Sequence, residues 1–247
     1  MVEPVEKQLK GGNTTPVARL GEQVLRESGP WTATVQKLLT HLRDQGIDWC
    51  PEPQGWHADG RESLTYLKGK VPTYPLPDWV YDEAVLTTAA TWLRQLHDAT
   101  VGFDAPAHVW RAARHQPAEV VCHNDFAPYN FVFRDHVLVG VIDWDFASPG
   151  PRLWDLAYLA YRMVPLMGPD NPNSPTTTKN LMARLRLLRD TYGSTASTHE
   201  ILATVVARLD ELADFTRGQA KTSKNPELLD HVRDYSTDAD FLRSLLG

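Results

Sequence analysis

The stretch CHNDFAPYNFVF, residues 122–133, and the stretch HVLVGVIDWDF, residues 136–146, decide the fold of the middle of the chain. Their apolar runs predict two β-strands, and the short turn between them predicts a hairpin. Polar side chains stand at the ends of these runs: Asp125, Asn130 and Asp143. Because carboxylates are costly to dehydrate, this position indicates a role other than packing. Strand pairing should bring Asn130 and Asp143, 13 positions apart, to the same edge.

Length and composition are those of a globular protein. The chain has 247 residues, 42% apolar and 23% charged, which is enough for one large domain or two small lobes. No apolar run approaches the roughly 18 residues of a membrane-spanning helix, and no secretory signal is visible, so no membrane partner is expected. Cys50 and Cys122 lack a spacing that would indicate a disulfide framework or a zinc site. A reducing cytoplasm is the expected location.

The net charge of −6 is concentrated in one part of the chain. Residues 73–160 hold 11 acidic and 5 basic side chains, whereas residues 1–72 hold 9 of each and residues 161–247 hold 11 of each. Such a balance makes nucleic acid a poor partner. A metal ion or a cationic substrate fits it better. A solvated acidic surface explains part of the excess equally well.

The N-terminal third predicts a small sheet with one helix. Short strands occupy the first 27 residues, and Gly21 marks a hairpin between two of them. A helix follows from Thr32, its expected cap, to the stop at Gly46, and another strand ends near Gly69. The apolar face of this helix is expected to consist of Val35, Leu38, Leu39 and Leu42.

Three prolines within residues 71–78 interrupt any regular element and predict the boundary between two lobes, 1–70 and 71–247. The second lobe contains the hairpin, a strand at 118–122, and helices. Helices are predicted at residues 82–100, from 151 onward, 179–192, 199–217 and 226–246, with a polar loop at 168–178. The order of elements predicts a two-lobed α+β fold with a small antiparallel sheet in the N-terminal lobe and a mainly helical C-terminal lobe.

The polar residues of the hairpin match the needs of phosphoryl transfer. Mg²⁺ prefers hard oxygen ligands, and the carboxylate of Asp143 with the amide of Asn130 supplies such a set. Asp125, five residues before Asn130, can accept a proton from an acceptor hydroxyl or orient that hydroxyl. The kinase pattern H-R-D-x-x-x-x-N, followed by a metal-binding Asp, has the same spacing. We therefore predict a divalent metal that carries a nucleoside triphosphate.

These motifs, with the later run PRLWDLAYL, closely resemble those of the aminoglycoside phosphotransferase and choline kinase-like family, including its compact, trifolitoxin-immunity-like phosphotransferases. The resemblance covers most of residues 5–165. It implies a protein-kinase-like fold with an N-terminal ATP lobe. It also implies that Asp125 is the catalytic residue and that Asn130 and Asp143 bind Mg²⁺.

Other roles follow from the same resemblance. His123 would brace the catalytic loop, and Asp155 would have a structural role. Tyr66 and Leu67 would lie in the hinge whose backbone meets adenine. Asp145 would either touch the metal or substrate or form local hydrogen bonds, and the sequence leaves both open.

The N-terminal lobe departs from the family pattern. Gly11 and Gly12, with Asn13 and Thr14, would form the hairpin that covers the phosphates, although a plain turn has the same signature. Arg26 stands where the family has a lysine; it can still neutralise phosphate, with a different reach. The helix glutamate that normally anchors the lysine is also replaced, at the position of Val35 or Gln36.

The resemblance implies an enzyme that uses ATP and Mg²⁺ to phosphorylate a hydroxyl of a small molecule, an antibiotic such as an aminoglycoside being one class. The altered Arg26 site leaves an alternative: a catalytically degenerate, kinase-like immunity protein that sequesters a toxin or ligand. Protein kinase activity is less favoured, since no activation segment separates Asp143 from Asp155. The sequence makes no prediction of the oligomeric state.

Overall fold

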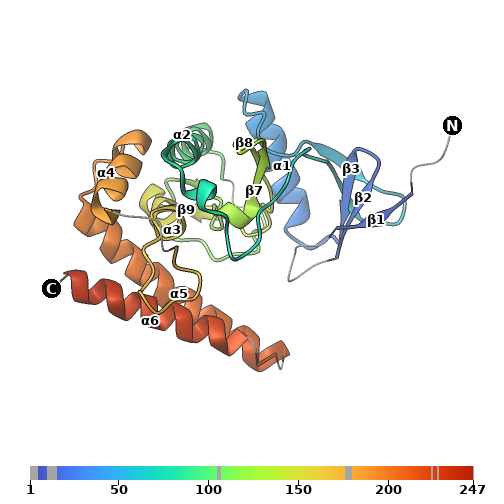
Figure 1. Cartoon of the computed structure of the whole chain (residues 1–247). Coiled ribbons are helices and arrows are strands. Elements are labelled where there is room, and N and C mark those ends of the chain that lie inside the picture. The colour runs from blue at the N-terminus through green and yellow to red at the C-terminus, as the bar shows by residue number, and fades with distance from the viewer. Residues whose placement is uncertain are drawn as a thin grey trace. The chain divides into compact units, whose positions relative to one another are not determined.

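The computed structural model describes residues 5–9, 16–104, 107–175, 180–223, 225–226 and 228–246. It is a mixed α+β protein, with an antiparallel sheet in the N-terminal part and helices in the C-terminal part (Figure 1). The predicted fold class is confirmed. Among the described residues, no helix combines the length and apolar character needed to cross a bilayer.

Two compact units make up the chain. The first unit consists of Met1–Thr73, Gln95–Asp125 and Tyr129–Pro151. The second unit consists of Tyr74–Arg94, Phe126–Pro128 and Arg152–Gly247. The central hairpin, residues 131–141, belongs to the first unit. The functional division into lobes 1–70 and 71–247 stays a prediction.

A five-stranded antiparallel sheet belongs to the first unit. Its strands, in the spatial order β1-β2-β3-β5-β4, are β1 Lys7–Gln8, β2 Val17–Leu20, β3 Gln23–Arg26, β5 Glu62–Thr65 and β4 Pro53–Trp56. The predicted turn at Gly21 joins β2 to β3, and its φ of 62° is one that glycine adopts without steric cost. Strand β4 was not predicted, because a proline and a glycine occupy two of its four positions, PQGW.

Helix α1, Thr32–Asp44, buries the predicted face, and Gly46 with a φ of 81° follows its end. The predicted cap is wrong. The N-cap is Trp31, and no side-chain hydrogen bond caps the helix. The Thr32 hydroxyl instead accepts a hydrogen bond from the backbone N–H of Gly29 at 2.8 Å, which ties the helix to the chain before it.

The central hairpin forms as predicted from strands β7, Phe131–Arg134, and β8, Val137–Val141. The predicted strand before it is β6, Val120–Cys122, which pairs with β9, Ser148–Gly150. Strand β9 was missed, because a proline and a glycine occupy two of its three positions. Two short 3₁₀ helices, Asp78–Tyr81 and Pro128–Asn130, complete the connections.

The second unit is helical. Its helices are α3 Arg152–Met163, α4 Leu181–Tyr192, α5 Thr198–Ser223 and α6 Leu228–Leu246, and α2 Glu83–Ala99 begins in it and ends in the first unit. Helix α5 contacts α3, α4 and α6, and Figure 1 shows α5 and α6 packed along each other. The predicted helices are confirmed, and α5 extends beyond its predicted end. Part of the predicted loop at 168–178 lies outside the described residues.

A buried carboxylate fixes α6 within the second unit. Asp238 is fully buried and accepts hydrogen bonds from the Tyr161 hydroxyl at 2.6 Å, the Gly168 N–H at 2.7 Å and the Asn171 side-chain amide at 2.7 Å. Burial raises the pKa of Asp238, and these three donors oppose the rise. Buried carboxylates need such partners, so this network holds α3, the loop after it and α6 together.

We predict that Gly69→Ala destabilises the first unit. A Cβ at Gly69 would lie 2.5 Å from Val132 Cγ1 and 2.6 Å from the Phe133 carbonyl oxygen, so β7 would have to shift. The free energy of unfolding should fall by about 1–3 kcal/mol, the usual range for overpacking. Chemical denaturation measures the change. Gly218→Ala is the matched control: nothing lies within 4 Å of its added Cβ, and alanine favours helix. Equal stabilities of the two variants would contradict the packing.

Candidate active site

Asp125 and Asn130 are brought together in the loop after β6. The Asn130 side-chain amide donates to the Asp125 backbone carbonyl at 2.9 Å and to its carboxylate Oδ2 at 2.8 Å. The Tyr129 hydroxyl donates to the other carboxylate oxygen. Both oxygens of Asp125 therefore have donors, which fixes the orientation of the carboxylate. The contact of Tyr129 with Asp125 was not predicted from the sequence, because it depends on the 3₁₀ turn.

Asp143 follows the partner strand at the same end of the hairpin. Phe131 pairs with Val141, and the N–H of Ile142 donates to the Asn130 carbonyl at 2.9 Å. Asn130 and Asp143 are thus neighbours across the hairpin end, as the spacing predicted. Asp143 has a φ of 64°, a left-handed conformation that is uncommon outside glycine and is enriched at functional sites.

The surroundings of Asp143 disfavour an isolated negative charge. Burial raises the pKa of Asp143 to about 6, Asp125 and Asp145 add to the rise, and Arg26 opposes it. Because 42% of the Asp143 side chain is still exposed, the carboxylate remains reachable from solvent. Carboxylates gathered in this way are stabilised by a cation, which would lower the pKa again.

Arg26, on β3, reaches these acids. Its Nε and Nη2 donate to Glu62 Oε2 at 3.1 and 2.7 Å, its Nη2 also contacts Asp145 Oδ1 at 2.7 Å, and its Nη1 lies 3.6 Å from Asp143 Oδ1. Burial alone would lower the pKa of Arg26, but Asp145 and Glu62 raise it above its usual value. The guanidinium is therefore charged and held beside the predicted metal ligands.

Glu62 was missed in the sequence. It belongs to β5, its side chain is fully buried, and its second oxygen lies 3.4 Å from the side-chain nitrogen of Gln36. Glu62 is the first residue of the strand ESLT, in which only Leu64 is apolar, so no pattern in the sequence marks this carboxylate as buried. Of the two residues at the expected helix-glutamate position, Val35 is buried in the core and Gln36 contacts Glu62.

Arg111 was also missed. Its guanidinium lies over the rings of Trp31, at 4.6 Å, and Phe146, at 4.5 Å, and its Nη1 is 3.4 Å from Asp145 Oδ2. Asp145 therefore contacts two arginines. We call the set of Glu62, Asp125, Asp143, Asp145, Arg26 and Arg111 the acid–arginine cluster. Its four carboxylates and two guanidinium groups leave an excess of negative charge when all are ionised, as a divalent cation requires.

His123 links the two halves of the site. Its Nε2 bonds the Ile142 carbonyl at 3.2 Å, so its Nδ1 accepts from the Asp125 N–H at 3.3 Å. Its ring lies 4.7 Å from that of Trp144. Asn124, with a φ of 64°, donates to the Phe146 carbonyl at 2.9 Å. These contacts are those expected of residues that brace a loop, the role predicted for His123.

The nucleotide-binding role of the remaining predicted residues stays a prediction. Gly11, Gly12, Asn13 and Thr14 lie outside the described residues. Tyr66 and Leu67 directly follow β5; the Tyr66 N–H donates to the Glu22 carbonyl at 2.8 Å, and Arg19 lies 3.8 Å from the centre of the Tyr66 ring. The role of both residues in binding adenine stays a prediction.

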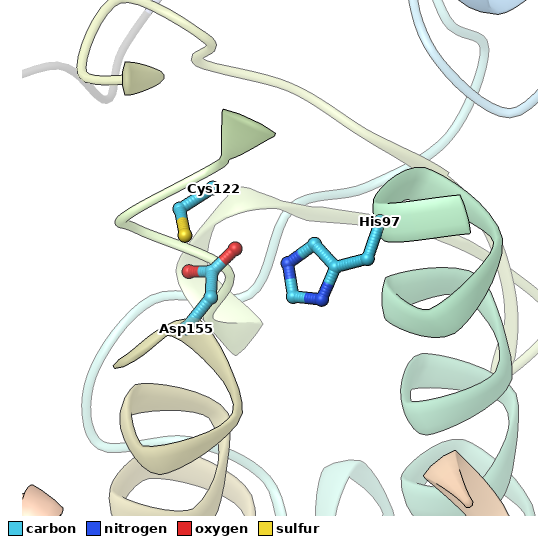
Figure 2. A group of neighbouring side chains, drawn as sticks. All are labelled: His97, Cys122 and Asp155. Carbon is cyan, nitrogen blue, oxygen red and sulfur yellow. The ribbon is translucent and has the colours of Figure 1, made fainter. Parts of the chain in front are cut away.

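Other buried ionisable side chains lie outside the acid–arginine cluster. Figure 2 shows His97, which projects from α2, and Cys122, at the end of β6, both in the first unit. The Cys122 thiol lies 3.5 Å from the Pro151 carbonyl. Asp155, also drawn in Figure 2, is buried in the first turn of α3 in the second unit.

Comparison with known proteins shows the family of the chain. Residues 21–188 match the model of the phosphotransferase enzyme family. The chain belongs to this family. The chain is also similar to the trifolitoxin immunity protein of Rhizobium leguminosarum bv. trifolii, with 35% identity over 194 residues that cover 75% of this chain and 73% of the relative. The resemblance inferred from the sequence motifs is confirmed.

Solved structures show the same fold. An ethanolamine kinase from Plasmodium vivax has a TM-score of 0.70 at 12% identity and is matched over 98% of this chain and 84% of its own. A spectinomycin phosphotransferase in complex with ADP and spectinomycin has a TM-score of 0.64 at 14% identity, over 96% of this chain and 92% of its own. At such identities the likeness shows the fold, which confirms the kinase-like class.

We predict that Arg26→Ala strongly destabilises the protein, because it leaves the fully buried Glu62 without its cation. Breaking a buried ion pair by removing one partner costs about 3–5 kcal/mol of unfolding free energy. Lys68→Ala is the matched control: it removes a cation from the ion pair with Glu22, whose side chains are 67% and 64% exposed, so little change is expected. Urea denaturation compares them. An Arg26→Ala variant as stable as the control would show that the pair is not a structural anchor.

Proposed function

We propose that the chain is an ATP- and Mg²⁺-dependent phosphotransferase that moves the γ-phosphate of ATP to a hydroxyl of a small molecule. The observation that carries the proposal is the meeting of Asp125, Asn130 and Asp143 at one end of the β7–β8 hairpin. Membership of the phosphotransferase family supports it.

The side chains present fit Mg²⁺. Asp143 offers a carboxylate beside two further acids. The amide nitrogen of Asn130 donates to Asp125, so its amide oxygen is the atom left for a cation. Hard oxygen donors of these two kinds are what Mg²⁺ prefers. When bound, the ion would neutralise negative charge on the phosphates.

Asp125 would act on the acceptor. Its carboxylate, held by Tyr129 and Asn130, would orient the acceptor hydroxyl and take its proton as the oxygen attacks the γ-phosphorus. The new bond joins the acceptor oxygen to phosphorus. The bond from phosphorus to the β-γ bridging oxygen breaks, and ADP leaves with that oxygen. Arg26 would supply positive charge to the phosphates.

The immunity alternative has its own support. The relative at 35% identity is an immunity protein, and the guanidinium of Arg26 is already engaged by Glu62 and Asp145. A protein that sequesters a toxin or drug would not need turnover. Stabilisation by Mg-ATP in a thermal shift, with ADP release in the presence of an acceptor, supports the enzyme. Tight binding of a peptide or drug without either would favour the immunity protein.

Asp125→Asn should abolish most phosphoryl transfer and leave nucleotide binding intact, because the amide cannot accept the hydroxyl proton. A positioned general base contributes about 10²–10⁴-fold, so kcat should fall by that factor. ADP release with a panel of aminoglycosides and amino alcohols measures it. Asp135→Asn, at an exposed position in the turn of the same hairpin, should keep full activity. Full activity of Asp125→Asn would contradict the assignment.

Asp143→Asn should weaken the part of nucleotide binding that depends on Mg²⁺. The substitution removes one ligand charge, and asparagine tolerates the left-handed backbone at this position. We expect the affinity for Mg-ADP to fall by at least about tenfold, which corresponds to ~1.4 kcal/mol. Calorimetric titration of ADP with Mg²⁺ and with EDTA separates the two parts. If Mg²⁺ strengthens ADP binding equally in the variant and the parent protein, Asp143 is not a metal ligand.

A further inference from the structure

Arg26 and Glu62 are direct partners across two neighbouring strands. The register of β3 and β5 places Arg26 opposite Glu62, next to the pair formed by Leu25 and Ser63. Opposite side chains on one face of an antiparallel pair interact directly. The Glu62 side chain is fully buried and that of Arg26 is 11% exposed, so water hardly screens their attraction. The sheet itself therefore holds this ion pair.

The contacts fix the orientation of the guanidinium. Glu62 Oε2 accepts from both Nε and Nη2 of Arg26, and Asp145 Oδ1 accepts from Nη2. Nη1 makes the longest contact of Arg26 with these three acids, at 3.6 Å from Asp143 Oδ1. A planar guanidinium held along one edge presents its remaining nitrogen in a set direction. Here that nitrogen faces the predicted metal ligand.

Gln36 completes the anchor from helix α1. Its side-chain nitrogen lies 3.4 Å from Glu62 Oε1 and 3.2 Å from the Gly55 carbonyl. Gln36 is neutral, so it cannot pair with a cation as a glutamate would. It instead orients the acid that does. In the family pattern a helix glutamate anchors the cation of β3, whereas in this chain the anchoring carboxylate is that of Glu62 on the adjacent strand β5.

We propose that Glu62, steadied by Gln36, is the positioning residue that aims Arg26 Nη1 at the phosphate groups of a nucleoside di- or triphosphate. The inference rests on the proposed phosphotransferase function and adds to it the residue that prepares the site for polyphosphate. Glu62 acts through Arg26 and does not touch the nucleotide.

The test measures the affinity for Mg-ADP by calorimetry, and the KM for ATP and kcat by ADP release. Glu62→Gln should weaken the affinity about 10- to 100-fold, the loss expected when hydrogen bonds to a charged group are disrupted. The KM for ATP should rise more than kcat falls, because Asp125 is untouched. Glu62→Asp keeps the charge and should recover part of the affinity. Glu27→Gln, which alters an exposed glutamate just after β3, is the matched control and should bind like the parent protein.

Thermal unfolding and circular dichroism check that each variant is folded. If Glu62→Gln does not fold, Gln36→Ala is the deciding variant, since Gln36 is half-buried and its removal leaves the Arg26–Glu62 ion pair in place while it takes away the Glu62 and Gly55 contacts of Gln36. It should weaken Mg-ADP binding about threefold or more. Folded variants that bind Mg-ADP as tightly as the parent protein would overturn the inference and leave the phosphotransferase proposal standing. A parent protein that binds no Mg-ADP would overturn both.

Discussion

Strand pairing between β7 and β8 is the constraint on which the acidic site depends. The register that sets Phe131 opposite Val141 also sets the start of one strand beside the end of the other, so Asn130 and Asp143 become neighbours. A slip of one residue would turn each side chain of one strand to the opposite face. Buried residues on both strands oppose such a slip. The position of the oxygen donors is therefore secured by the apolar packing beneath them.

Charge compensation is the second constraint. The acid–arginine cluster gathers carboxylates from the β5 strand, the loop after β6 and the turn after β8. Two guanidinium groups, of Arg26 and Arg111, offset part of this charge, and aromatic rings hold Arg111 in place. The two guanidinium groups leave the cluster with an excess of negative charge when all of its groups are ionised. An excess of negative charge attracts cations.

Local features of the site were predictable, and distant ones were not. Asp125, Asn130 and Asp143 lie within one loop and one hairpin, so the predicted strand pairing was enough to bring them together. Arg26 and Glu62 are 36 positions apart, and Arg111 and Asp145 are 34 positions apart. No local pattern in the sequence marks these contacts. The fold was predictable for the same reason: helices and hairpins are local, whereas β9 depends on its pairing with the distant strand β6.

The strand-borne partner of Arg26 has a consequence for regulation. In a kinase whose catalytic cation is anchored by a helix, rotation of that helix separates the pair and turns the enzyme off. Here the pair is built into one β-sheet, so the sheet would have to come apart before the cation loses its anchor. In the proposed phosphotransferase the anchor of Arg26 would therefore always be in place, and activity would follow the supply of substrate and the amount of protein made.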